Sequence, residues 1–200
     1  MKDAIRFLTT VLPEPGPDVR YFCWSPGMQE AFRSPEALAE RAFKLSDEGR
    51  DAYMALAGFD LSGSRRQEHA VSVRSLWLDI DCGKDSGPSY PDKPAALAGL
   101  AAFVAKLELP KPLVVDSGHG LHVYWPFTRD VTPTEWRELA VNLKGACLAH
   151  GLKADHHRTT DVASVLRMPG TMNYKRRTPQ SVEEWMLDPE VSYDMAELPT

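Results

Sequence analysis

The run VSVRSLWLDIDC, residues 71–82, predicts a β-strand whose two faces differ in chemistry. Side chains alternate along a strand, so Asp79 and Asp81 share one face, while the leucines and the isoleucine beside them share the other. The apolar face is expected to fill the core. The two carboxylates then project together from a rigid strand, about 7 Å apart.

Two carboxylates at this separation repel each other unless a cation lies between them or one of them is protonated. Magnesium and manganese prefer hard oxygen ligands, and magnesium is commonly held by one or two carboxylates together with the phosphates of a substrate. Nucleotidyl transfer uses two such ions, one to activate a 3′-hydroxyl and one to neutralise the leaving pyrophosphate. The alternative interpretation is a solvated strand end whose aspartates begin the next loop.

The elements expected from residue 71 onward come in the order β-α-β-β-α-β. This order is typical of the split βαβ arrangement, an α+β fold in which helices cover one face of an antiparallel sheet. After the first strand the pattern predicts a helix at 95–107, a β-hairpin at 111–127, a helix at 134–151 with Thr132 or Thr134 as its cap, and strands at about 162–168 and 182–187. Many functions share this fold, so the predicted sheet does not indicate a chemistry.

The first 70 residues predict a second, smaller group of elements. They are a helix at 1–11, a strand at 21–24, a helix from the N-cap Ser34 to about Lys44, and a further helix at 48–58. The chain of 200 residues, with 43% hydrophobic and 26% charged residues, is long enough for one sizeable α/β domain.

The segment SGHGLH, residues 117–122, joins the two strands of the predicted hairpin. Gly118 and Gly120 permit a tight turn and the close approach of a ligand, and backbone N–H groups in such turns can cradle phosphate oxygens. Ser117 can add a hydroxyl donor. His122 alternates with apolar neighbours, so we expect it on an exposed sheet surface like that of the aspartates, where it can donate to a triphosphate. The alternative is an ordinary glycine-rich hairpin with incidental histidines.

A third polar segment, LKADHHRTTDVASVLRMPGTMNYK, spans residues 152–175. Asp155 or Asp161 can supply the third carboxylate of a two-metal site. Beyond these acids, the polar residues that can contact phosphate or pair with it are Arg167, Asn173 and Lys175. The alternative is that the two aspartates cap turns and that Arg167 pairs with a surface acid.

Cysteines and histidines do not indicate a zinc site. Cys23, Cys82 and Cys147 are far apart and form no C-x-x-C pair, so we expect buried, reduced thiols. The histidines that could bind zinc have spacings that fit no zinc pattern. These histidines are His119, His122, His156 and His157.

Charge and hydropathy narrow the possible classes of protein. The net charge of −5 does not suggest a free-standing DNA-binding domain, although basic residues cluster at 65–66 and 175–177. No stretch approaches the roughly 20 consecutive apolar residues that a membrane span requires. The first residues do not form a signal peptide, so we expect a cytoplasmic protein.

Taken together, the three polar motifs resemble the archaeo-eukaryotic primase (AEP) superfamily, in its phage and plasmid primase-polymerase branch. The matching segments, in the order of the family, are LWLDIDCG at 76–83, SGHGLHVYW at 117–125 and D-x₅-D-x₄-LRMPGTMNYK at 155–175. The resemblance implies an RRM-like antiparallel catalytic sheet, residues 71–200, with a small N-terminal α/β module, residues 1–70, packed beside it. The zinc cluster of many cellular primases is missing, and so is a helicase motif, although relatives often continue into a helicase. We therefore expect a domain excised from a longer protein.

The resemblance also implies roles for individual residues. Asp79, Asp81 and Asp155 would be the metal ligands, with Asp161 the second choice for the third position. The residues assigned to catalysis are these four aspartates and His122, and those assigned to nucleotide binding are Ser117, Gly118, Gly120, His122, Arg167, Asn173 and Lys175. The expected cofactors are two magnesium or manganese ions and no zinc.

The implied function is a primase-polymerase of phage or plasmid replication, acting in the cytoplasm of the bacterial host. It would bind a single-stranded DNA template, a primer strand and dNTPs or NTPs, and it would have no contact with a membrane. The first alternative is a metal-dependent nuclease or a relaxase-like enzyme. The second is a non-catalytic RRM-like single-strand binder that stacks bases on Trp77, Tyr124 or Trp125.

Overall fold

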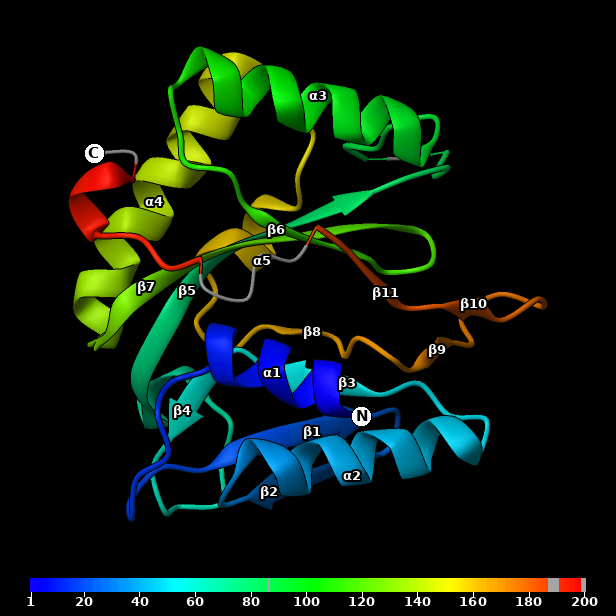
Figure 1. Cartoon of the computed structure of the whole chain (residues 1–200), viewed down its shortest axis with the longest axis vertical. Coiled ribbons are helices and arrows are strands. Elements are labelled where there is room, and N and C mark those ends of the chain that lie inside the picture. The colour runs from blue at the N-terminus through cyan, green and yellow to red at the C-terminus, as the bar shows by residue number, and fades with distance from the viewer. Residues whose placement is uncertain (86, 187–190, 199–200) are drawn as a thin grey trace.

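The computed structural model describes residues 1–85, 87–186 and 191–198. Its central sheet is antiparallel, with the strand order β11-β6-β7-β5-β4 (Figure 1). The strands of this sheet are β4 (Ala57–Phe59), β5 (Ala70–Asp81), β6 (Leu113–Asp116), β7 (Gly120–Val131) and β11 (Glu183–Met186). This sheet, with helices packed on it, confirms the predicted α+β fold class.

The strand that carries the two aspartates is β5, as predicted, and it pairs with β7; the pairing of β6 with β7 confirms the predicted hairpin. In the register of this pair, Asp79 lies opposite His122, and Asp81 lies opposite Gly120. Residues directly opposite each other in an antiparallel pair project from the same face. The pairing therefore brings the first two polar motifs together on one face of the sheet.

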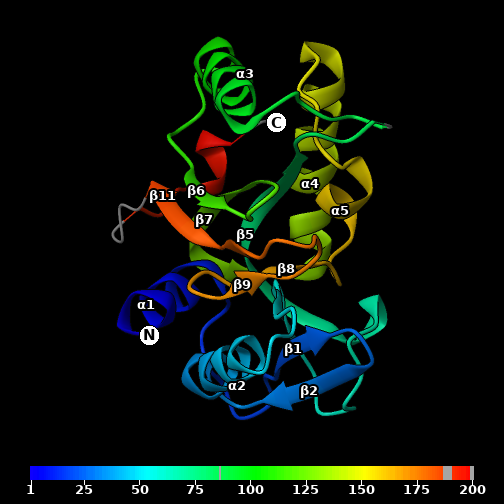
Figure 2. The ribbon, with the colours of Figure 1, turned by 90° about the vertical axis from the view of Figure 1, so that its right-hand side faces the viewer.

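Two long helices lie on one side of the central sheet, α3 (Lys93–Lys106) and α4 (Pro133–His150) (Figures 1 and 2). Local signals set the bounds of α4. The Thr132 side chain accepts a hydrogen bond from the N–H of Glu135, and the Glu135 side chain accepts one from the N–H of Thr132, which forms a capping box. Gly151 ends the helix with a positive φ of 70°. Both predicted helices are confirmed, with Thr132 as the cap.

The opposite side of the central sheet faces α1 (Lys2–Val11) and a second antiparallel sheet, of order β2-β1-β3-β8. Helix α2 (Pro35–Asp47) packs on α1 and on this second sheet. The strands of this second sheet are β1 (Tyr21–Ser25), β2 (Met28–Phe32), β3 (Tyr53–Ala55) and β8 (Val165–Arg167). The predicted helix at 1–11, the strand at 21–24 and the helix capped by Ser34 are confirmed. Strand β2 was not predicted.

The predicted helix at 48–58 is wrong, because this segment forms β3 and the start of β4. Its alanines, methionine and leucine favour a helix when taken alone. In the fold, β3 lies between β1 and β8, and β4 pairs with the beginning of β5. The hydrogen bonds and burial supplied by these distant strands outweigh the local preference for a helix.

The last strands depart from the split βαβ order. In that order the last strand of the motif lies beside its first strand, which here is β5. In this structure β4 lies beside β5 instead, and the last strand, β11, pairs with β6 at the other edge of the sheet. The predicted strand at 162–168 is present as β8, and it joins the N-terminal sheet. The predicted strand at 182–187 is present as β11, although Leu187 lies outside the described residues.

The remaining elements are short. They are α5 (His156–Thr160), which was not predicted, the two-stranded ribbon of β9 (Met172–Asn173) and β10 (Gln180–Ser181), and the 3₁₀ turns η1 (Gln67–His69) and η2 (Met195–Glu197). None of the helices in the described parts of the chain is long and apolar enough to cross a membrane.

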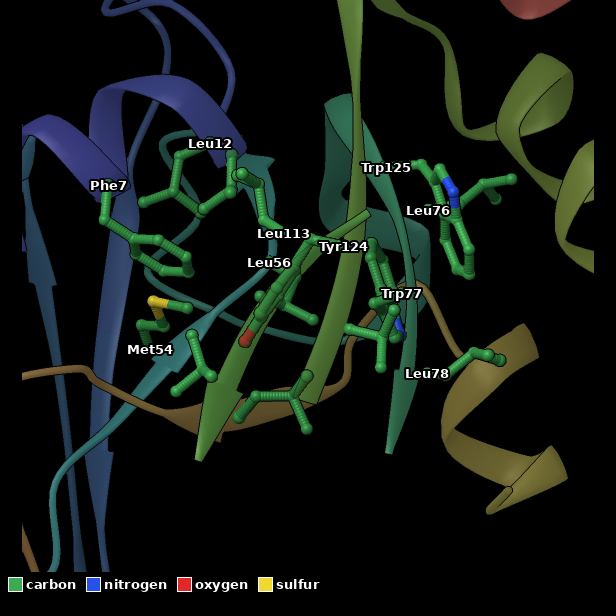
Figure 3. Packing of buried hydrophobic residues seen from close by; sticks show 14 of the residues in the cluster. Phe7, Leu12, Met54, Leu56, Leu76, Trp77, Leu78, Leu113, Tyr124 and Trp125 are labelled. Carbon is green, nitrogen blue, oxygen red and sulfur yellow. The ribbon is translucent and has the colours of Figure 1, made fainter. Parts of the chain in front are cut away.

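The hydrophobic core extends over both sides of β5 and β7. Figure 3 shows Trp125 and Leu76 on the opposite side of these strands from Phe7 of α1. Tyr124 meets Phe7 edge to face with ring centroids 5.2 Å apart, and Trp77 stacks on Trp136 of α4 at 4.6 Å. The three aromatic residues that the alternative single-strand binder would use for stacking, Trp77, Tyr124 and Trp125, are all buried and offer no stacking surface. The three cysteines are free and buried, as predicted.

Candidate functional site

A polar cavity of about 210 Å³ lies between the aspartate face of the central sheet and the strands β3 and β8. It brings together residues from all three sequence motifs. Those predicted residues that line it are Asp79, Asp81, Ser117, His122, Arg167, Asn173 and Lys175. Long-range pairing builds this cavity, because β8 reaches over the face of β5 and β7 to pair with β3.

Asp79 is the most strongly perturbed acid of the cavity. Its Oδ1 lies 3.8 Å from Nε2 of His122, and its Oδ2 lies 3.1 Å from Nε of Arg158. Burial, followed by the negative charge of Asp81, raises the pKa of Asp79 to about 6, although Arg158 acts in the opposite direction. Burial and the charge of Asp81 thus outweigh the attraction of Arg158, and the protonated form of Asp79 is favoured more than in an exposed carboxyl group.

Asp81 ends β5 beside the glycine hairpin. Its carboxylate accepts a hydrogen bond from the ammonium group of Lys84 in the following loop. A Cβ atom at Gly120 would lie 2.2 Å from the carbonyl oxygen of Ile80, so only glycine lets the hairpin lie this close to the end of β5. This close approach positions the Ser117 loop next to the aspartates.

His122 shares the face of Asp79, as predicted, but it is not on an exposed surface. Its residue is only 4% exposed, because β8 and the N-terminal strands cover this face of the sheet. Burial, together with the positive charges of Arg167 and Arg158, lowers the pKa of His122 to about 3, so the ring is neutral at physiological pH. Its Nδ1 atom has no hydrogen-bond partner within the described part of the chain.

Arg167 enters the cavity from β8 and is held in a fixed orientation. Its Nη1 donates to Oδ1 of Asp51 at 2.6 Å, and its guanidinium carbon lies 4.5 Å from the centre of the Tyr53 ring. Burial raises the pKa of Asp51, but hydrogen bonds from Arg167 and from the backbone N–H of Tyr174 outweigh it and lower the pKa overall. The partner of Arg167 is thus a partly buried acid rather than a fully exposed one.

The two acids predicted as candidates for a third carboxylate, Asp155 and Asp161, lie outside this cavity. The backbone N–H of Asp155 donates to the carbonyl oxygen of Asp79 at 2.8 Å, and Nε of Arg158 lies 3.6 Å from Oδ2 of Asp155. The other candidate, Asp161, instead accepts hydrogen bonds from the Gln67 side chain and the Ala163 backbone. Neither acid lines the 210 Å³ cavity, but Asp155 is the one bonded to the strand of Asp79.

The glycine hairpin does not offer the expected backbone cradle at its first two positions. The N–H of Ser117 donates to the carbonyl oxygen of Gly120, and the N–H of Gly118 donates to the carboxylate of Asp116. The side-chain amide of Asn173 donates to the Ser117 carbonyl at 2.6 Å and so ties β9 to the hairpin. Phosphate contacts from Ser117 would therefore come from its hydroxyl group.

Sequence reasoning missed three residues that shape the site. Asp51 and Tyr53, which orient Arg167, lie in the segment predicted to be helical. Arg158 lies one helical turn after Asp155, and this i,i+3 spacing of opposite charges was the only signal for it.

The oxygen donors of Asp79 and Asp81 fit a hard divalent cation such as magnesium or manganese. In the described residues, no group of three or more His, Cys, Asp or Glu side chains is arranged to hold a metal ion. The guanidinium of Arg158 lies against both Asp79 and Asp155, and Lys84 contacts Asp81. Two carboxylates thus fit an ion whose other ligands come from phosphates, while a three-acid set is not preassembled.

No protein-family model and no curated protein matches this sequence. Solved structures do match it over nearly its whole length. The AEP domain of the primase-polymerase of cyanophage S-2L aligns with a TM-score of 0.62 and 20% identity, over 91% of this chain and 89% of that domain.

Two further structures are similar. Primase RepB′ aligns with a TM-score of 0.57 and 14% identity, over 95% of this chain and 57% of that one. The polymerase domain of Mycobacterium tuberculosis ligase D, solved in complex with DNA, aligns with a TM-score of 0.51 and 18% identity, over 92% of this chain and 70% of that one. The chain therefore shares the fold of these AEP primase and polymerase domains.

Proposed function

We propose that this chain is a primase-polymerase that adds nucleotides to a 3′-hydroxyl, directed by a single-stranded DNA template. The observation that carries the proposal is the composition of the cavity. Its acidic part is Asp79 and Asp81, and its basic part includes Arg167 and Lys175. Carboxylates for divalent ions beside cations for phosphates are the arrangement that transfer from a nucleoside triphosphate requires.

In this proposal Asp79 and Asp81 hold magnesium or manganese, and Asp155 is the third ligand. The ions would activate the attacking hydroxyl and neutralise the leaving pyrophosphate. The contribution of the chain is to hold the carboxylates on a rigid strand. The backbone bond from Asp155 to Asp79 keeps the third acid beside the pair.

Arg167, Lys175 and His122 would bind the triphosphate. The guanidinium of Arg167 is oriented by Asp51 and Tyr53 before any ligand arrives, so little reorganisation is needed when a phosphate binds. His122 is neutral and can donate one N–H without adding charge. The Ser117 hydroxyl is a further donor at the same wall of the cavity.

The two alternative functions are less well supported. A single-strand binder would need exposed stacking surfaces, and Trp77, Tyr124 and Trp125 do not provide them because they are buried. A metal-dependent nuclease could use the same two carboxylates. The similar solved structures are described as a primase-polymerase, a primase and a polymerase domain, which favours transfer over hydrolysis.

The test is incorporation of labelled dNTPs and NTPs on a single-stranded template, with and without a primer, in Mg²⁺ and in Mn²⁺. We expect the wild-type protein to lengthen the primer and Asp79→Asn to lose roughly a thousandfold in rate, because one metal ligand is removed. Asp18→Asn, at an exposed loop position, is the matched control and should retain full activity.

Lack of incorporation by folded wild-type protein, or equal activity of Asp79→Asn, would contradict the proposal. Shortened strands in the same assay would instead support the nuclease.

A further inference from the structure

The carboxylates of the site have cations of their own already in contact with them. Nε of Arg158 lies 3.1 Å from Oδ2 of Asp79 and 3.6 Å from Oδ2 of Asp155. The ammonium of Lys84 contacts Asp81 in the same manner. Each of the three acids proposed as metal ligands is thus neutralised in part by an arginine or a lysine.

These cations differ from Arg167 in how firmly they are held. The Arg158 and Lys84 side chains are each 40% exposed, whereas the Arg167 side chain is 6% exposed and is fixed by Asp51 and Tyr53. Ion pairs at such exposure contribute little to stability and are easily replaced. A divalent ion binds carboxylate oxygens directly and carries twice the charge. Arg158 and Lys84 are therefore open to displacement by a metal ion, whereas Arg167 is held by Asp51, which is not one of the proposed metal ligands.

Arg158 also has space to move. It forms part of the wall between the 210 Å³ cavity and a second polar cavity of about 630 Å³, which is lined by Gln67, Arg137 and Asp161 among others. Its Nη1 donates a hydrogen bond to the carbonyl oxygen of Val165 at 3.0 Å, and its Nε lies against both acids. A side-chain rotation toward the second cavity, which Asp155 also lines, would take the guanidinium away from Oδ2 of Asp79 without a change in the backbone.

We propose that Arg158 is a built-in counter-ion, which pairs with Asp79 and Asp155 in the metal-free protein and yields them when a divalent ion binds. The backbone bond between Asp155 and Asp79 keeps the two acids adjacent whether or not Arg158 is in place. The inference rests on the proposed function, because it takes these acids to be metal ligands.

The test is a titration with Mn²⁺ alone, without nucleotide, in which free Mn²⁺ is measured by electron paramagnetic resonance. Removing a competing positive charge should strengthen binding, and we expect Arg158→Gln to lower the Kd about tenfold. Arg158→Lys keeps the charge and should stay within about threefold of the wild type. Arg129→Gln removes a surface arginine that pairs with Glu135, and it should not change the Kd.

Arg158→Ala is a second neutral variant in case Arg158→Gln does not fold, and circular dichroism in EDTA checks the fold of each. An unchanged or weaker affinity in a folded neutral variant would overturn the inference, as would an Arg158→Lys protein that binds as tightly as Arg158→Gln. Asp79→Asn separates the two proposals. If it binds Mn²⁺ as well as the wild type does, the assignment of the metal ligands fails, independently of Arg158.

Discussion

Both faces of the β5–β7 pair are covered, but the two covered faces differ in how completely they are filled. On one face, Leu78 and Val123 lie in a continuous apolar core on the side of α3 and α4. On the other face, Asp79 and His122 lie under β8, and the 210 Å³ cavity separates their side chains from this strand. Figure 3 shows that Leu78 projects from the strands in a direction different from that of Tyr124.

Unsatisfied polar atoms distinguish the second face. Three buried side-chain atoms on or beside it have no hydrogen-bond partner among the described residues, and they are Nε2 of His119, Nδ1 of His122 and Oη of Tyr124. Each such atom costs about 1–3 kcal/mol unless water or a ligand satisfies it. One face of the same two strands therefore serves stability, and the other gives up stability to keep a polar cavity.

The largest expected difference between the two faces is in the free energy of unfolding of variants at two neighbouring residues. Leu78→Ala removes a fully buried side chain from the apolar face, and we expect a loss of roughly 2–5 kcal/mol in the free energy of unfolding. Asp79→Asn, one residue later, should cause no such loss, because it removes a buried charge. Urea denaturation of both variants in EDTA measures the difference. Equal losses at the two positions would show that the faces are equivalent.

The next largest expected effect is a difference between the wild type and Asp79→Asn in how stability depends on pH. In the metal-free protein the pKa of Asp79 is raised from 3.8 to about 6, so folding favours its protonated form. As pH rises from 4 through 6, the wild-type protein should therefore lose stability relative to Asp79→Asn, which is uncharged throughout. The loss should reach about 3 kcal/mol above pH 7.

This difference is measured by urea denaturation of both proteins in EDTA between pH 4 and 8. Use of the difference cancels the contribution of His122, whose pKa is lowered and which acts in the opposite sense below pH 6.5. A gap between the two proteins that does not change with pH would contradict the environment assigned to Asp79.

The smallest effect concerns the exposed rim of the polar face. Lys175 lines the cavity but is exposed, so Lys175→Gln should change the free energy of unfolding by no more than about 0.5 kcal/mol. It should raise the KM for dNTPs about tenfold, because a phosphate-binding charge is lost. Arg177→Gln, also exposed but outside the cavity lining, is the control. Steady-state kinetics in which both variants have the same KM would remove Lys175 from the site.

Local signals in the sequence were sufficient for most elements of the fold. Alternation along residues 71–82 placed Asp79 and Asp81 on one face, and the caps Ser34, Thr132 and Gly151 are where the sequence indicated. Such signals act within a few residues of each other, and tertiary contacts need not be known to use them.

The cover of the polar face was not predictable in this way. Tyr53 pairs with Arg167 across 114 positions of the chain, and no local pattern indicates that pairing. The helix wrongly expected at 48–58 and the exposed surface wrongly expected for His122 have this common cause. This pairing forms one wall of the cavity. The residues expected to bind nucleotide could therefore be named from the sequence, but the burial and the fixed orientation of Arg167 could not be predicted.

The central claim is that the polar face binds a nucleoside triphosphate together with divalent ions. A crystal structure with Mn²⁺ and a non-hydrolysable dNTP analogue tests it most directly. The account predicts anomalous scattering from Mn²⁺ at the carboxylates of Asp79 and Asp81, with the triphosphate against Arg167 and Lys175. Well-defined nucleotide bound elsewhere, with no Mn²⁺ at either carboxylate, would contradict it.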